Sequence, residues 1–214
     1  KSVTLLGQGY PLSTITGLKA GASATVRIAA LNTTVDGFTI TRDGNNTTDW
    51  NSNAKVMGIG IQGTSVSATI KNNKITGNRT GIDINQSDNN TINNNLIYFN
   101  RSGMLLRNAC LSNVVKENNI SNNWTMGVLW LNAGTETATG TQFFNNKIDS
   151  NWYVQIENRS VTGGVKNFSA NWYGTNAPSV VNTNGSEPGY EAIIPILYGG
   201  TSTPPGGMPD IRGA

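Results

Sequence analysis

The sequence predicts an all-β fold, a right-handed single-stranded parallel β-helix, which is a solenoid of about seven rungs with a C-terminal cap. Three observations predict this class. A segment of 22 to 24 residues recurs along the chain, apolar and polar residues alternate within each copy, and asparagine recurs at the same turns. Common helical solenoids need about 33 residues per repeat, so the shorter period favours three short strands and three turns in each rung.

The repeat is clearest in the middle of the chain, where Asn-Asn-X-Ile-X-X-Asn is followed by Gly-Ile-X-Ile. Four registered copies span residues 70–84, 92–106, 115–130 and 143–151. Weaker copies occupy residues 35–40, which lead through an insertion into 58–61, and residues 165–171. Within a copy, Ile82 and Ile84 flank Asp83, and this alternation is the period of a strand. Leucine-rich repeats share the repeat length, but their leucine and asparagine spacing is missing, so the β interpretation is favoured.

The recurring asparagines predict hydrogen-bonded ladders along the solenoid. Asparagine tolerates the left-handed backbone of a tight turn, and its side-chain amide both donates and accepts hydrogen bonds. Stacked on successive rungs, such amides bond to one another and are structural. We expect one ladder of Asn73, Asn95, Asn118 and Asn146, and a second of Asn78, Asn100, Asn123, Asn151 and Asn171.

The domain organisation follows from where the repeat ends. Residues 1–174 are expected to form the parallel β-helix, and residues 175–214 a C-terminal cap followed by a Pro/Gly-rich linker that begins near Gly199. A cap covers strand edges that would otherwise promote aggregation. The chain opens in mid-pattern at Lys1, which is typical of a processed protein or of a piece of a longer one.

Composition excludes several function classes. Charged residues make up 13% of the chain, against roughly 25% in ordinary domains, and the net charge of +3 includes no basic run, which argues against a nucleic-acid partner. No stretch approaches the roughly 20 apolar residues of a membrane span. Histidine is absent, which removes Ser-His-Asp and histidine-metal chemistry, and the single Cys110 is expected to be a buried hydrophobe. No metal site and no cofactor is expected.

The Asn-Asn-X-Ile-X-X-Asn and Gly-Ile-X-Ile pattern resembles the repeat of the pectin-lyase-like right-handed parallel β-helix superfamily over about residues 30–175. The segment 168–174 and the tail resemble the end of β-helix domains in large bacterial secreted or surface proteins. The resemblance implies an extracellular or cell-surface location. It also implies that Gly-Ile-X-Ile lies in the first sheet of each rung, on the face where enzymes of this superfamily place their sites. The superfamily includes lyases, hydrolases, epimerases, adhesins and tailspikes, so activity stays open.

Alternation predicts which residues of that face point outward. The set is Gly60, Gln62, Asp83, Asn85, Leu105, Arg107, Gln155 and Glu157, with either Leu129 and Leu131 or Val128 and Trp130. The last choice is open because this rung has one extra residue before Gly127, and a slip of one residue reverses the faces of a strand.

The chemistry of this face argues against a glycoside hydrolase. Asp83 and Glu157 are expected about three rungs apart, or about 14 Å, whereas an inverting pair needs about 6.5 to 9.5 Å. A polysaccharide lyase needs a base, for which Arg107 is a weak candidate with Asp83 as its diagonal neighbour. A lyase of this type would use calcium, for which one acid is a poor site.

Aromatic residues supply the other functional signal. Trp124, Trp152-Tyr153 and Trp172-Tyr173 each follow a turn asparagine, and such a stripe either stacks on sugar rings or packs on the flank of the solenoid. The insertion 43–55 is either a surface loop or a wall beside a groove. We predict an extracellular carbohydrate-binding or adhesive module whose partner is a polysaccharide; a lyase acting on an acidic glycan and a structural spacer are the alternatives. The predicted binding residues are Arg107, Trp124, Trp130, Trp152, Tyr153 and Glu157.

Overall fold

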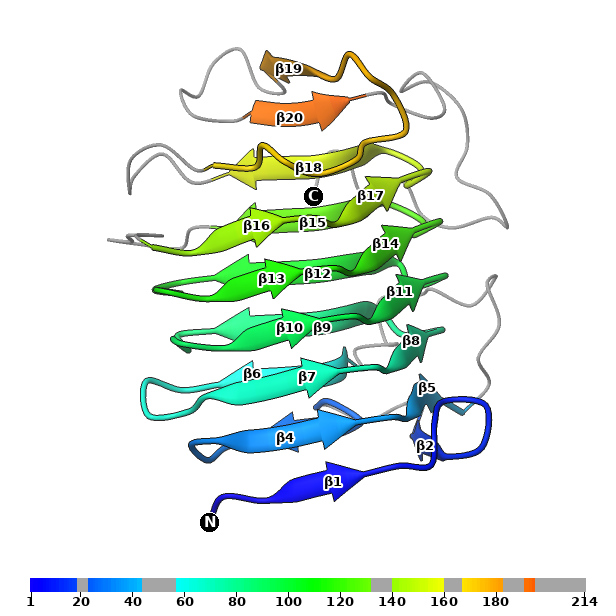
Figure 1. Cartoon of the computed structure of the whole chain (residues 1–214), viewed down its shortest axis with the longest axis vertical. Helices are drawn as coiled ribbons and strands as arrows, with labels where there is room; N and C mark the ends of the chain where they lie inside the picture. Colours follow the sequence, from blue (N-terminus) through cyan, green and yellow to red (C-terminus); the bar gives the residue numbers. More distant parts are fainter. Residues whose placement is uncertain (19–22, 44–56, 132–139, 160–166, 183–190, 195–214) are drawn as a thin grey trace.

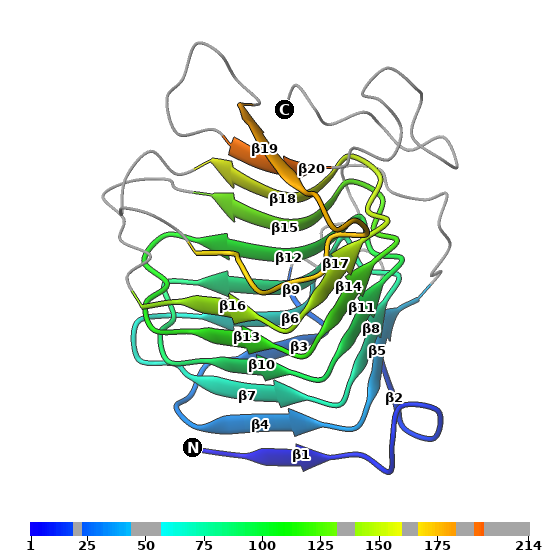
Figure 2. The same ribbon diagram turned by 45° about the horizontal axis from the view of Figure 1, so that its top comes forward.

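The computed structural model describes residues 1–18, 23–43, 57–131, 140–159, 167–182 and 191–194. Within them every regular element is a strand, and the parallel β-helix predicted from the repeat is confirmed. Three parallel sheets, here called A, B and C, wind around one interior, and each rung adds one strand to each sheet (Figures 1 and 2). Each sheet has six parallel strands in the described part, against the expected seven or so rungs.

The three sheets follow one another along the chain. Sheet A contains β1 (Thr4–Leu6), β4 (Thr33–Asp36), β7 (Ala68–Lys71), β10 (Thr91–Asn93), β13 (Val114–Lys116) and β16 (Gln142–Phe144). Sheet B contains β2 (Thr14–Gly17), β5 (Thr39–Arg42), β8 (Lys74–Thr76), β11 (Leu96–Tyr98), β14 (Asn119–Ser121) and β17 (Lys147–Asp149). Sheet C contains β3 (Val26–Ile28), β6 (Met57–Gln62), β9 (Thr80–Asn85), β12 (Ser102–Arg107), β15 (Met126–Leu131) and β18 (Val154–Arg159).

The interior is made of apolar columns, because parallel pairing in register places equivalent residues directly above one another. In sheet B, Ile75 pairs with Ile97, Ile97 with Ile120 and Ile120 with Ile148, and all four are fully buried. Cys110 lies in the same core, as expected for a small hydrophobe. The single core therefore runs the length of the stack and holds the rungs in register.

The first asparagine ladder is confirmed and is one residue longer than predicted. Between sheets A and B, the side-chain oxygen of each asparagine accepts from the backbone N–H and the side-chain amide of the asparagine on the preceding rung. Asn146 donates both groups to Asn171, at 3.0 and 2.8 Å. Asn171 therefore belongs to this ladder, and its assignment to the second ladder was wrong.

The second ladder, between sheets B and C, joins Asn78, Asn100, Asn123 and Asn151. It ends on Gln155, whose side-chain oxygen accepts from the backbone and the amide of Asn151. Gln155 is buried by this role, so its predicted outward position is corrected.

A third, shorter ladder at the turn between sheets C and A was not predicted. The side-chain oxygen of Asn113 accepts from the backbone N–H and the amide of Asn90, at 2.9 and 2.7 Å. The Asn90 oxygen in turn accepts from the Ala68 N–H, and the Asn113 N–H donates to the Thr141 hydroxyl. All three corners of the solenoid thus satisfy their buried backbone groups with stacked polar side chains.

Two antiparallel strands cover the end of sheet C. β20 (Glu191–Ile194) pairs with β18, and β19 (Ser179–Asn182) pairs with β20, beyond the last parallel strand (Figure 1). This position suits a cap, while the domain boundary at residue 174 stays a prediction. The linker predicted from Gly199 and most of the insertion 43–55 lie outside the described residues. No helix in the described ranges has the length and apolarity to cross a membrane.

Candidate functional site

Sheet C presents two outward columns of side chains. The first runs through Arg27, Gly60, Asp83, Leu105, Leu129 and Glu157. The second runs through Gln62, Asn85, Arg107, Leu131 and Arg159. The residues between them along each strand, such as Ile82 and Ile84, are fully buried in the core. Apart from Gln155, the outward set expected from alternation is confirmed.

The open choice at the fourth rung is decided in favour of Leu129 and Leu131. Val128 pairs with Met104 and Trp130 with Leu106, so the extra residue of this rung is absorbed before Gly127. Trp130 lies in the core, with its ring 6.2 Å from Phe143 and 6.0 Å from Phe168. Trp130 therefore does not point outward on sheet C, and the proposals below do not use it.

Arg107 and Asp83 form a two-pronged ion pair on this face. Arg107 donates from Nε to Oδ1 at 3.0 Å and from Nη2 to Oδ2 at 2.8 Å. Burial raises the pKa of the Asp83 carboxyl, and the Arg107 hydrogen bonds and the charges of Arg107 and Arg79 oppose that rise. The two residues are diagonal neighbours, as predicted. Two of the Arg107 donors are already bonded to Asp83, and a guanidinium with no free lone pair facing a substrate is a poor candidate for a base.

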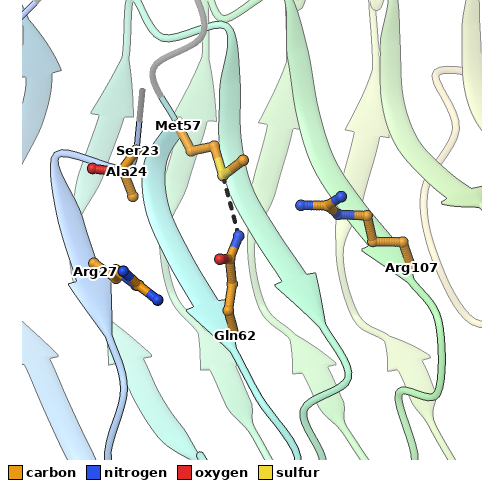
Figure 3. Close-up of a pocket in the computed structure, with 6 residues that line it drawn as sticks. All are labelled: Ser23, Ala24, Arg27, Met57, Gln62 and Arg107. Carbon is orange, nitrogen blue, oxygen red and sulfur yellow. Dashed lines mark hydrogen bonds between the residues drawn. The ribbon is translucent and has the colours of Figure 1, made fainter. Parts of the chain in front are cut away.

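A hollow of about 280 Å³ lies beside this pair, over the first strands of sheet C. Its lining residues are Ser23, Ala24, Arg27, Met57, Gln62 and Arg107. Figure 3 shows Arg27 and Arg107 on opposite sides of Gln62, each with its guanidinium directed toward the space between them. The Gln62 amide donates to the Met57 sulfur at 3.7 Å, which orients it beside the hollow.

One residue gives the hollow its space and another gives it its charge. Gly60 has no side chain between Arg27 and Asp83 in the outward column, and a Cβ there would lie 3.0 Å from the Ala24 Cβ and 3.8 Å from the Gln62 amide nitrogen. Arg27 is exposed and forms no salt bridge to a carboxylate of the described residues. Sequence reasoning missed Arg27 and Met57, although the Val26-Arg27-Ile28 alternation was a signal for the first.

Glu157 is buried and paired with Arg159, whose Nη2 lies 3.1 Å from Oε2. It occupies the same column as Asp83, separated from it by Leu105 and Leu129. At the usual strand spacing, the two acids are about 14 Å apart, as expected from the sequence. In the described structure Glu157 therefore has an internal partner and little accessible surface.

The aromatic residues do not form a continuous exposed stripe. Trp152 is buried, and Tyr153 is half-buried against Met126 and Val154. Trp124 is half-buried and stacks on Phe99, with ring centroids 6.1 Å apart at an interplanar angle of 28°. Because Phe99 is 39% exposed, the accessible aromatic surface at this corner is the Phe99–Trp124 pair.

Metal-ligating side chains are few and scattered. The sequence contains no histidine, and among the described residues no three of Cys, Asp and Glu cluster as a metal site. Cys110 is buried, with Sγ 3.2 Å from the Arg107 carbonyl oxygen. Met57 and Met126 begin β6 and β15, which two strands of sheet C separate, so their sulfurs do not share a site.

One family model matches the chain, over residues 13–186, and its description is periplasmic copper-binding protein (NosD). The match covers the β-helix from β2 to β18 and the cap strand β19. No curated protein and no solved structure matches the chain significantly.

Proposed function

We propose, from the premise that this chain belongs to the NosD family of periplasmic β-helix proteins, that it is an extracytoplasmic module which binds an acidic polysaccharide on sheet C. The observation that supports the proposal is the hollow between Arg27 and Arg107. Both cations face one space, and Arg27 has no carboxylate partner among the described residues. An anionic group of a ligand would supply that partner.

The chemistry of the lining suits a sugar acid. Guanidinium groups bind carboxylates through two parallel hydrogen bonds, and Arg107 uses two of its five N–H donors on Asp83, so the others stay available to a ligand. The Gln62 amide offers polar contacts to hydroxyls, and the Met57 thioether offers an apolar wall. Gly60 leaves room for a flat ring to approach the sheet.

A solenoid also suits a polymer better than a single small molecule. The outward columns of sheet C repeat at the strand spacing of about 4.8 Å, so an extended chain can make similar contacts on successive rungs. Leu105, Leu129 and Leu131 continue the face beyond the hollow as partly exposed apolar surface. A cationic contact for the acidic group, flanked by apolar surface for the ring faces, is the arrangement expected for the binding of acidic sugars.

Copper, which the family description names, does not fit the described residues of this chain. Copper sites are built from imidazole, thiolate and thioether ligands, which are grouped around one point. Histidine is absent, Cys110 is buried in the core, and the methionines at the starts of β6 and β15 lie on separate rungs. We therefore assign no step or site to copper here.

The lyase alternative has less support than binding. Its base would be Arg107, which is already engaged by two hydrogen bonds to Asp83, and one buried carboxylate is a poor calcium site. Incubation of the chain with polygalacturonate, with and without calcium, tests it through the ultraviolet absorbance of unsaturated products. A calcium-dependent rise that Arg107→Lys abolishes would replace the binding proposal by the lyase.

The binding proposal is tested by calorimetry of the chain against polygalacturonate, alginate, xylan and a soluble cellulose derivative without charge. We expect the two acidic glycans to bind, and we expect Arg27→Gln to lower their affinity about tenfold, as loss of one charged hydrogen-bonded contact predicts. Lys116→Gln, which removes the same charge from sheet A, is the matched control and should leave affinity unchanged. No binding, or binding that Arg27→Gln leaves intact, would contradict the proposal and favour a structural spacer.

A further inference from the structure

The corner between sheets B and C carries two arginines on adjacent rungs. Each rung places one residue directly after its second-ladder asparagine, and these residues are Arg79, Arg101, Trp124 and Trp152. The Ser102 N–H donates to the Arg79 carbonyl at 3.0 Å, and the Thr125 N–H donates to the Arg101 carbonyl at 2.7 Å. Arg79 and Arg101 are thus stacked at the strand spacing of about 4.8 Å.

Neither arginine has a counter-charge of its own in the described part of the chain. Both are half-buried, their Nε atoms are buried without a hydrogen-bond partner, and neither forms a salt bridge there. Burial and the charge of Arg79 lower the pKa of Arg101 to about 10. The charge of Arg79 acts on the Asp83 carboxylate, which already accepts two hydrogen bonds from Arg107.

The β-helix does not need cations at this corner. The next two rungs place Trp124 and Trp152 at the same position, with the same backbone hydrogen bonds to the rung below. Two stacked like charges, partly removed from water, oppose folding rather than support it. Arg79 and Arg107 both act on the single Asp83 carboxylate, and Arg101 has no salt bridge among the described residues, so positive charge is in excess here and is available to a ligand.

The corner is continuous with the hollow on sheet C. Thr80, which follows Arg79, pairs with Met57 on one side and with Ser102 on the other, and Met57 lines the hollow. On the opposite side, Trp124 follows Arg101 in the stack, and Phe99 lies against its ring. Along the starts of these strands, the hollow is thus followed by the two arginines and then by the Phe99–Trp124 pair.

We propose that Arg79 and Arg101 form a second anion subsite, which binds the carboxylate or sulfate group of one acidic sugar while another occupies the hollow beside Arg27. This inference rests on the proposed binding of an acidic polysaccharide. It explains why two rungs carry arginine where the fold accepts tryptophan. The ring of the bound sugar would lie against Trp124.

The test compares Arg79→Gln/Arg101→Gln with Arg27→Gln by calorimetry, using polygalacturonate, dextran sulfate, uncharged dextran and galacturonic acid monomer. We expect the double variant to lower the affinity for the two anionic polymers about tenfold or more. Its affinity for the monomer, which needs only the hollow, should be unchanged. Arg27→Gln should weaken both. The charge-matched control is Lys116→Gln/Lys147→Gln, which alters sheets A and B only. Tighter binding of polygalacturonate than of dextran sulfate identifies the group as a carboxylate, and the reverse identifies a sulfate.

Each outcome separates the two proposals. Polymer binding that Arg27→Gln weakens but the double variant does not would overturn the second subsite and leave the proposed function standing. No polymer binding by the unmodified chain would overturn both, and binding to anionic phospholipid vesicles that the double variant loses would then replace the glycan by a membrane surface. Thermal unfolding without ligand gives an independent readout: Arg101→Gln should leave Tm unchanged or raise it. A fall of several degrees would make the pair structural and overturn the subsite.

Discussion

The asparagine ladders at the corners and the outward face of sheet C are built from the same rungs but follow opposite rules. In the ladders asparagine recurs on successive rungs, and its backbone N–H and side-chain amide donate to the oxygen of the copy on the next rung. On the face, one column reads Arg27, Gly60, Asp83, Leu105, Leu129 and Glu157. Repetition therefore marks positions that stabilise the solenoid, and departure from repetition marks positions available for recognition.

The energetic contrast is visible in two residues. Asn118 donates from its amide to Ile92, Lys116 and Asn146 at 2.9 Å each, and its oxygen accepts twice from Asn95. Arg27 has no salt bridge among the described residues. A buried group with every bond made supports the fold, whereas an exposed cation without a partner contributes little to it.

The largest expected effect comes from the tightly packed glycines at the second position of the sheet C strands, such as Gly103 in β12. A Cβ at Gly103 would lie 2.5 Å from the Gly127 carbonyl oxygen and 2.8 Å from the Ile120 methyl group. Backbone of the next rung cannot retreat without breaking sheet C, so Gly103→Ala should cost about 3 kcal/mol or more. Chemical denaturation measures this cost. Gly60→Ala, on the outward face, is the matched control and should cost about 1 kcal/mol or less.

The ladder is tested by Asn118→Ala. The substitution removes the side chain that accepts from the backbone N–H of Asn95 and donates to the Ile92 carbonyl, at a cost of about 1 to 3 kcal/mol. Thermal or chemical unfolding gives the value. Asn93→Ala, at an outward position of β10, should change stability by less than about 0.5 kcal/mol, and equal effects of the two substitutions would contradict the assigned role of the ladder.

The contrast also explains how much the sequence could predict. Ile75, Ile97 and Ile120 recur 22 and 23 residues apart, so the fold and the first ladder follow from a nearly regular spacing. Asn171 was misassigned because Asn171-Trp172-Tyr173 repeats the local pattern of Asn151-Trp152-Tyr153, although only the three-dimensional register decides its partner. The third ladder was missed because turns between sheets C and A vary in length.

The candidate site was less predictable for the same reason. Asp83 and Arg107 were found because they lie on clear copies of the repeat, and their ion pair is a diagonal contact on adjacent rungs. Arg27 lies on a three-residue strand without a clear copy, and Trp130 lies on a rung with one extra residue. Recognition surfaces consist of such departures, so periodicity cannot identify them.

A smaller effect should separate binding from stability at Gly60. The added methyl group of Gly60→Ala enters the hollow between Arg27 and Gln62 and meets the Ala24 Cβ. We expect affinity for polygalacturonate to fall about fivefold while Tm stays nearly constant, because this face is outside the packed core. Calorimetry with a parallel melting curve checks both. Unchanged affinity would mean that the ligand does not enter the hollow.

The smallest effect concerns Asp83, which belongs to both sides of the comparison because it is buried yet faces outward. Burial raises its pKa, so its folded-state value lies above that of the unfolded chain. The stability from this group is then complete at low pH and is lost as pH rises through the folded-state pKa. An asparagine side chain cannot ionise, so the stability of Asp83→Asn relative to the unmodified chain should improve between about pH 3 and about pH 7. Chemical denaturation of both proteins at several pH values measures this difference.

The same substitution should also change the affinity for an acidic glycan. Asp83→Asn removes a negative charge from the face and leaves Arg107 with an amide oxygen as its neighbour, so two of its donors are held less tightly. Affinity for polygalacturonate should therefore rise about two- to threefold at low ionic strength, and the rise should disappear as salt screens the charges. Calorimetry at two salt concentrations measures both changes. Loss of binding would instead show that the carboxylate is needed to orient Arg107, and the recognition surface would then depend on a buried, fully paired group as the ladders do.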